Sequence, residues 1–513
     1  MAITISRWQI YVVRSAASAW SILVLIAPAR AADWNVVPAL HLRESYSDNV
    51  LLAPPAQAQG DVINEIAPSI SILGNGPRLK LSLAYTLQKL MYQRQPDRNN
   101  QQLSASANGE ILEDWFFVDL RSSVSQQNIS AFGPQPVDNV GLAANQSTVR
   151  ANTVSPFLRH HFRDLATAEL RYSHDAVSSN DNLLAAKTDE LQLKLTGDRQ
   201  GHGWSWGANT EQKSTHDNSL DTVHMSRTTL TLNYPPSSRL NLFASTGYEK
   251  EGYTTSMASQ PSGRSWSIGA GWYPSGRTSV VASGGKRFFG NTYSLEASHH
   301  SHHTTWTLNY GEDISSTPAE LMRLSSTDTA NLLNQLWSAS IPDPQLRQQQ
   351  VNTFLRFSQL LGPDVGAVNY FTHSYFLQKQ MSLNMVTGTP KNTLLLGLSS
   401  TRRSAQTSSA IDSVLLPAYT IGLDDQTRQS ALNGAWNWRM SARNSFSASA
   451  SYGTVKSLTL NRLDSNLVFS ASLNRIVRPK VSASIDVRHV RHGSTGGGDY
   501  RENALGVSLN FTL

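Results

Sequence analysis

The most regular feature of the sequence is an alternation of apolar and polar residues with a period of two. Between Arg78 and Leu87, leucines and Tyr85 occupy every second position, and small or charged residues such as Lys80 separate them. A half-buried strand repeats in this way, whereas a helix repeats every three to four residues. The same alternation recurs along the chain, at 116–121, 191–195, 229–234, 446–452, 481–488 and 505–513. The sequence therefore predicts an all-β protein.

The pattern of strands favours a transmembrane antiparallel β-barrel over a soluble sandwich. In a membrane barrel one face of each strand meets lipid and the other lines a wet lumen, and short periplasmic turns alternate with long outer loops. A sandwich would repeat in modules of about 100 residues, and no such break is visible. The long connections are 45–60, 127–147, 175–186, 250–262 and 402–425. Counting strands between turns predicts about 22 (18 to 22), with both chain ends on the periplasmic side.

The composition agrees with a barrel and excludes other classes. Only 39% of residues are hydrophobic and 16% are charged, as expected of a fold without a dry central core. The chain has no cysteine, which excludes a disulfide scaffold and any Cys-based metal or thiol site. A helical membrane transporter is excluded because no apolar run of about 18 residues follows the N-terminal region.

Residues 1–31 are predicted to be a secretory signal peptide. Arg7 and Arg14 precede an apolar stretch centred on 23–26, and Ala29-Arg30-Ala31 has the small-x-small form of a cleavage site. Removal of the three arginines lowers the formal charge from +6 to +3, so charge gives little support for nucleic-acid binding, and we expect no nucleic-acid partner. We expect 32–513 to form the barrel in the outer membrane of a Gram-negative cell, in contact with its lipid.

One segment, 311–365, is too long for a simple hairpin loop. Asp343 can cap a helix that begins at Pro344, and Gly362-Pro363 can end it. A weaker helical stretch covers 319–336. The sequence therefore predicts a partly helical insert that either plugs the lumen or caps the outer mouth, since barrels of about 22 strands commonly hold a plug.

The sequence carries no recognisable catalytic or cofactor motif. It lacks the Gly-x-Ser-x-Gly elbow, a phosphate loop and a metalloprotease helix, so we expect no enzyme activity and no cofactor. The best metal candidate is the histidine-rich stretch 299–303, whose imidazoles suit Zn, Cu or Ni. A polar periplasmic turn without metal is the simpler interpretation, because nothing in the sequence supplies a fixed second shell of hydrogen bonds.

Charged residues of both signs fall on the polar faces of the predicted strands. A wall of mixed sign favours a cross-strand charge ladder over an ion-selectivity filter. Tryptophans near the predicted short turns are expected to form an interfacial girdle at one rim. The predicted lumen-facing residues are Lys80, Asp119, Arg121, Glu169, Arg171, Lys194, Arg439, Asp486 and Arg488, and the girdle tryptophans are Trp115, Trp204, Trp272, Trp306, Trp436 and Trp438.

Several segments together carry a family resemblance. They are the stretch 46–50, the insert from Pro342 to Pro363, the following strand 369–380 and the alternating C-terminal strand. With these the sequence resembles the outer-membrane β-barrels associated with PEP-CTERM/exopolysaccharide systems of Gram-negative bacteria. The resemblance implies a link to production or export of extracellular polysaccharide, and it transfers no catalytic residues.

Three functional hypotheses follow. The first is a pore or accessory factor in exopolysaccharide secretion, with polysaccharide and export-machinery proteins as partners. The second is a non-transporting structural barrel of an envelope complex. The third and least favoured is a barrel enzyme acting on lipid or polysaccharide, which would need Ser, His and carboxylate groups to converge near one rim.

Overall fold

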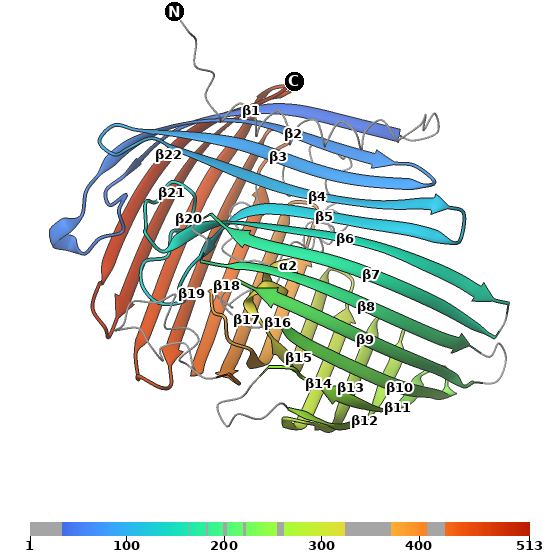
Figure 1. Ribbon diagram of the computed structural model, residues 1–513. Helices are drawn as coiled ribbons and strands as arrows, with labels where there is room; N and C mark the ends of the chain where they lie inside the picture. The colour runs from blue at the N-terminus through green and yellow to red at the C-terminus, as the bar shows by residue number, and fades with distance from the viewer. Residues whose placement is uncertain are drawn as a thin grey trace, which may run out of the picture.

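The computed structural model is a closed antiparallel β-barrel of 22 strands, as the alternation predicted (Figure 1). It describes residues 33–163, 165–180, 183–198, 203–218, 222–253, 261–323, 371–407 and 426–513. Each strand pairs with its neighbours in the chain. The first strand, Asp33–Ser47, also pairs with the last, Tyr500–Thr512, from Ala39↔Thr512 to Ser47↔Ala504, and so closes the sheet. The predicted signal peptide lies outside the described residues. The first described element is β1.

The strands are 10 to 17 residues long. Their bounds are β1 Asp33–Ser47, β2 Asp61–Asn75, β3 Leu79–Tyr92, β4 Arg98–Leu112, β5 Phe116–Asn128, β6 Gln146–Phe162, β7 Ala166–Ser179, β8 Ala185–Asp198, β9 Ser205–Asp217, β10 Val223–Ser237 and β11 Leu240–Lys250. The second half comprises β12 Ser262–Ser275, β13 Thr278–Arg287, β14 Gly290–His300, β15 Thr304–Ser315, β16 Phe376–Gly388, β17 Asn392–Ala405, β18 Gln426–Arg439, β19 Asn444–Ser457, β20 Leu463–Arg478, β21 Val481–Ser494 and β22 Tyr500–Thr512. Among the described residues, two short helices lie between strands, η1 Pro55–Gln57 and α2 Thr317–Arg323.

The two ends of the barrel differ in their connections. Short turns join β2 to β3, β4 to β5 and the following even–odd pairs, at the end where β1 begins and β22 ends. Some of these turns are so tight that a residue with a side chain adopts a left-handed conformation, with φ of 59° at Asp114, 48° at Arg163 and 70° at Lys480. Most connections at the opposite end are longer. The short-turn end is therefore the periplasmic end, and the long loops lie outside.

The outer surface of the barrel is apolar and the inner surface polar. On β22, Leu505, Val507 and Leu509 are 40–51% exposed on the outside, whereas the inward Ser508 is 4% exposed. Of the predicted girdle tryptophans, those at 115, 204, 272, 306 and 436 are 38–55% exposed beside the periplasmic turns. Rings with one apolar and one wet edge favour this level of a membrane. No helix among the described residues is long and apolar enough to span a membrane.

The predicted insert is only partly described. Its first residues, 311–315, continue β15, and α2 follows at Thr317–Arg323. The remainder, including the helix expected at 345–361, lies outside the described residues. Residues 371–375 then lead into β16.

Candidate functional site in the barrel lumen

Much of the lumen wall is made of hydroxyl groups that pair across neighbouring strands. Inward-pointing serines of adjacent strands hydrogen-bond each other at 2.6–2.8 Å, as Ser245 does with Ser267. The short side chains present hydroxyl groups to the barrel interior, and each hydroxyl can also bond water. The inward pairs are Ser155–Ser173, Thr188–Thr215, Ser245–Ser267, Ser279–Ser298, Ser283–Ser294, Ser449–Ser470 and Ser484–Ser508.

Three of the residues predicted to face the lumen form one charge cluster. Arg171 on β7 donates to Asp119 at 2.7 Å and lies 3.1 Å from Glu169. Arg159 on β6 contacts the other oxygen of Glu169 at 2.8 Å. The Arg171 guanidinium also lies 3.8 Å from the centre of the Phe157 ring. Three neighbouring strands are thereby cross-linked on the inner face.

Two more predicted residues belong to a second cluster, which spans the seam between β1 and β22. Arg43 on β1 bonds Asp486 on β21 at 2.6 Å, and Arg488 bonds Glu502 on β22 at 2.8 Å. Gly506 makes room for this cluster, because a Cβ there would lie 2.7 Å from the Arg43 guanidinium.

The four other predicted residues lie outside these two clusters. Lys80, Arg121 and Lys194 lie on the inward-pointing positions of β3, β5 and β8 and are exposed, and within the described chain none of them makes an ion pair. Arg439 ends β18 at the periplasmic side, on the inward register that it shares with the buried Asn433. The inner wall is thus cross-linked near Arg171 and near Arg488, whereas Lys80, Arg121 and Lys194 lie outside these clusters.

The largest feature that sequence reasoning missed is the connection from β5 to β6, residues 129–145, here called the mouth loop. It folds into the barrel instead of extending outward. The Tyr92 hydroxyl donates to the carbonyl of Val140 at 2.7 Å, and Val140 packs with Ile63 and Leu90. At its other end Ala131 and Phe132 pack against Val455 on β19, and Val137 packs against Tyr500 on β22. The loop therefore lines the inner wall from β3 across the seam to β19.

The centre of the mouth loop is held by charge. Asp138 accepts a hydrogen bond from Arg488 and lies 3.8 Å from Arg43. Burial alone would raise the pKa of Asp138, but the two guanidiniums outweigh it and hold that pKa below its ordinary value. The arginines of the predicted ladder therefore anchor this loop as well as tying strands together.

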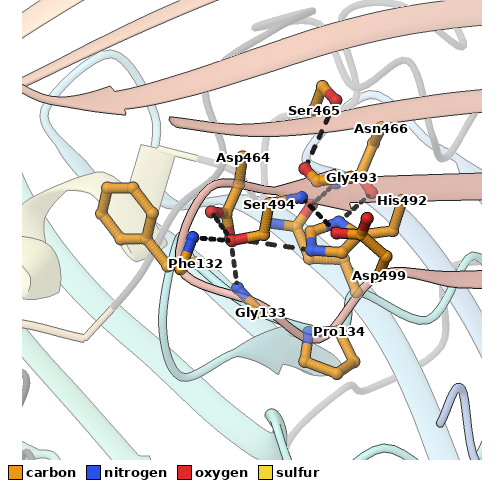
Figure 2. A network of polar contacts seen from close by, with 12 residues as sticks. Phe132, Gly133, Pro134, Asp464, Ser465, Asn466, His492, Gly493, Ser494 and Asp499 are labelled. Atoms are coloured by element: carbon orange, nitrogen blue, oxygen red, sulfur yellow. Dashed lines mark hydrogen bonds and ion pairs between the residues drawn. The ribbon is translucent and has the colours of Figure 1, made fainter. Parts of the chain in front are cut away.

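A second anchor lies at Asp464 on β20 (Figure 2). Its carboxylate accepts from the backbone N–H of Gly133 at 2.8 Å, from Ser494 at 2.6 Å and from Arg462 at 2.9 Å. Beside it, His492 Nδ1 lies 2.7 Å from the side-chain oxygen of Asn466. Asp464 thus joins the mouth loop to the outer ends of β20 and β21.

The other side of the outer mouth is lined by α2 and residues 371–375. The buried Arg403 on β17 bonds Glu320 of α2 at 2.6 Å. His373 lies 3.0 Å from Asp217 on β9, and the rings of Tyr253 and Tyr375 stack at 4.9 Å. The N–H of Phe371 donates to the carbonyl of Ile129, which connects this lining to the mouth loop. Segments docked against the inner wall therefore lie on both sides of the outer mouth.

The described residues hold no group of three or more His, Asp or Glu side chains placed to bind a metal ion. In the histidine-rich stretch, His300 ends β14 and a tight turn leads to β15 at Thr304. Nδ1 of His302 lies 3.0 Å from Nε2 of His303, and both rings are exposed at the periplasmic rim.

The comparisons with known proteins concern the fold. The sequence matches no protein-family model and no curated protein. Similar solved structures include the FrpB iron transporter of Neisseria meningitidis (F5-1 variant, apoprotein form), with a TM-score of 0.51 and 9% identity, covering 93% of this chain and 81% of that one. The siderophore receptor PirA of Pseudomonas aeruginosa has a TM-score of 0.45 and 9% identity, with 93% and 80% covered. At such identity the likeness shows the fold alone, which is that of Gram-negative outer-membrane barrels.

Proposed function

We propose that the chain is an outer-membrane pore for hydrophilic polymers and serves in the secretion of exopolysaccharide. The observation that carries the proposal is the inner wall, where cross-strand hydroxyl pairs such as Ser245–Ser267 and Ser449–Ser470 alternate with paired charges. A sugar chain presents hydroxyls that exchange hydrogen bonds with such a wall and with its water. The resemblance to exopolysaccharide-associated barrels supports the choice of polymer.

The docked segments favour a regulated pore over a freely open one. The mouth loop and the lining formed by α2 and 371–375 narrow the outer mouth, and both are held by polar anchors such as Asp138–Arg488 and Glu320–Arg403. Charge-assisted hydrogen bonds are strong enough to hold a loop and weak enough to be exchanged. Passage of a polymer then requires these anchors to open.

The test is transport by the purified chain in lipid. The chain is reconstituted into liposomes, and efflux of size-graded neutral oligosaccharides is compared with planar-bilayer conductance, for the parent and for a variant whose mouth loop is shortened. The proposal expects a small conductance in the parent and a larger conductance with oligosaccharide efflux in the variant. No conductance in either would overturn the pore and favour a non-transporting structural barrel.

A further inference from the structure

The periplasmic rim of the barrel is divided by charge. The six turns between β10 and β21 contain no aspartate or glutamate within 237–240, 275–278, 300–304, 388–392, 439–444 and 478–481. The same turns carry seven cations, which are Arg239, Arg277, Lys391, Arg439, Arg443, Arg478 and Lys480. We call this set the basic arc. On the other side of the rim the turn after β4 holds Glu113 and Asp114, and Glu113 pairs with Arg78 at 2.6 Å.

The basic arc contains a hollow of about 500 Å³ between the turns of β10–β11, β12–β13 and β14–β15. Arg239, Arg277 and His300 line it, together with Tyr273 and the hydroxyls of Ser279 and Ser298. Both arginines are exposed, and neither makes an ion pair within the described chain. The hollow therefore has cationic groups and hydrogen-bond donors and no acidic lining residue.

The backbone fixes the positions of the two arginines. The carbonyl of Arg239 accepts from the N–H of Tyr273 at 2.7 Å, and the carbonyl of Arg277 accepts from the N–H of His300 at 2.7 Å. Strand alternation places these two arginines, together with Tyr273 and His300, on the inward face that also carries the pair Ser279–Ser298. Since the arginines directly precede β11 and β13, they are separated by two strand spacings, or about 10 Å. Their guanidiniums can therefore approach one extended ligand from the lumen side.

We propose that this hollow binds an anionic group of the solute that enters the pore, and that the solute is a polymer bearing carboxylates, such as a uronate-containing polysaccharide. The substrate assignment rests on the function proposed above, whereas the binding site does not. Arginine presents a planar fork of donors that matches a carboxylate, and exposed arginines without partners retain their full binding capacity.

The position of the hollow favours a solute over a lipid headgroup. Arg239 and Tyr273 belong to the inward register, while the neighbouring Trp272 is 55% exposed on the lipid face. The remaining cations of the basic arc would draw an anionic chain towards this inner mouth, because a charged entrance raises the local concentration of counter-ions.

The experiment measures equilibrium binding to the full chain in nanodiscs of phosphatidylcholine alone. Calorimetry compares trigalacturonate, which carries carboxylates, with neutral maltotriose of similar length and with inorganic phosphate. We expect trigalacturonate to bind, maltotriose not to bind, and binding to weaken as salt rises. The double variant Arg239→Gln/Arg277→Gln should bind at least about tenfold more weakly, because it loses two charge-assisted contacts.

Two variants control for indirect effects. Arg78→Gln removes an arginine from the opposite side of the rim and should leave affinity unchanged, and Arg239→Lys/Arg277→Lys keeps the charge and should retain much of the binding. Equal affinity in the parent and the double glutamine variant would overturn the site, as would equal binding of maltotriose. Binding of phosphate without trigalacturonate would also overturn it. So would loss of trigalacturonate binding when phosphatidylglycerol is added at constant ionic strength, because the hollow would then be a headgroup site.

This measurement separates the two proposals. A chain that binds trigalacturonate but conducts nothing would overturn the pore and leave the anion site standing. A chain that conducts but does not bind trigalacturonate would overturn the anion site alone.

Discussion

At the scale of single residues, the solvent on each side of the wall decides which side chain a position accepts. On β8, Leu193 is 40% exposed on the lipid face, whereas Lys194 and Thr196 lie on the opposite, inward face. Consecutive residues of a strand therefore face different surroundings, lipid on the outside and water on the inside. A charge costs little on the wet face and several kcal/mol at the lipid midplane.

Substitution Leu193→Arg is expected to destabilise the barrel by about 2–4 kcal/mol, because it places a guanidinium in hydrocarbon. Thr196→Arg on the same strand should cost less than about 1 kcal/mol, since the lumen face is wet. Equilibrium urea unfolding of the liposome-inserted protein measures both. Equal costs for the two substitutions would contradict the assignment of faces.

Strand alternation predicts which charges face the lumen, but it does not predict their partners. The alternation along β7 predicts that Glu169 and Arg171 point inward. That Arg171 reaches Asp119 across β6 depends on inter-strand register, which shifts at irregularities such as that between Glu110 and Leu112. The role of Arg43 could have been anticipated, since it shares the inward register of Ser45 on β1.

Asp138 offers a test of the loop anchor with a defined dependence on pH. Because its pKa is held below the ordinary value near 4, its ion pair is complete above that pH and is lost as the pH falls through the lowered pKa. Asp138→Asn should loosen the mouth loop and raise planar-bilayer conductance at pH 7. The conductance of the parent should approach that of the variant only as the pH falls through this lowered pKa.

The matched control is Asp97→Asn, which makes the same change at an exposed residue between β3 and β4 and should leave conductance unchanged. Equal conductance of the parent and the Asp138→Asn variant at pH 7 would contradict the anchor.

At the scale of elements, the strands could be predicted from the sequence and the docked loops could not. A strand is encoded locally, by alternation and turn residues. The mouth loop is determined by distant partners, because Ala131 meets Val455 and Gly133 meets Asp464, more than 300 residues away along the chain. The available signal was its apolar content, since Phe132 and Val140 are unusual in a solvated outer loop.

Replacing residues 131–143 with a short Gly-Ser linker should enlarge the outer mouth and raise single-channel conductance several-fold, because the wall that the loop covers becomes open to water. Residues 54–59 of the β1–β2 loop include η1 and are exposed. Replacing them in the same way should have little effect on conductance. Planar-bilayer recording compares the two variants. An unchanged conductance after removal of the mouth loop would show that the constriction lies elsewhere.

At the scale of the whole molecule, closure removes every sheet edge, which a membrane requires of any β structure. The seam is held by the backbone pairing of β1 with β22. Side chains also contact across it, as His41 does, whose Nδ1 lies 2.6 Å from Asn510 Oδ1. The count of 22 strands was predicted because turns and alternation repeat independently in each hairpin. The division of charge around the periplasmic rim emerges only when turns far apart in sequence are placed on one ring.

The absence of native cysteine allows a direct test of the seam. The pair His41→Cys/Asn510→Cys should oxidise to an intramolecular disulfide in the folded protein, because the two side chains face each other across β1 and β22. The pair His41→Cys/Ser484→Cys, whose second position lies one strand further away, should remain reduced. Mobility on denaturing gels distinguishes the products, and failure of the first pair to cross-link would indicate an open sheet.

The central claim is that lipid contacts one side of the strands and water the other. Single spin labels at each position from 191 to 196 of β8, in the liposome-inserted protein, report collisions with oxygen, which concentrates in lipid, and with a water-soluble nickel chelate. The account predicts high oxygen accessibility at 191, 193 and 195, and high nickel accessibility at 192, 194 and 196. A profile without this two-residue period, or nickel access on both faces, would contradict the membrane barrel.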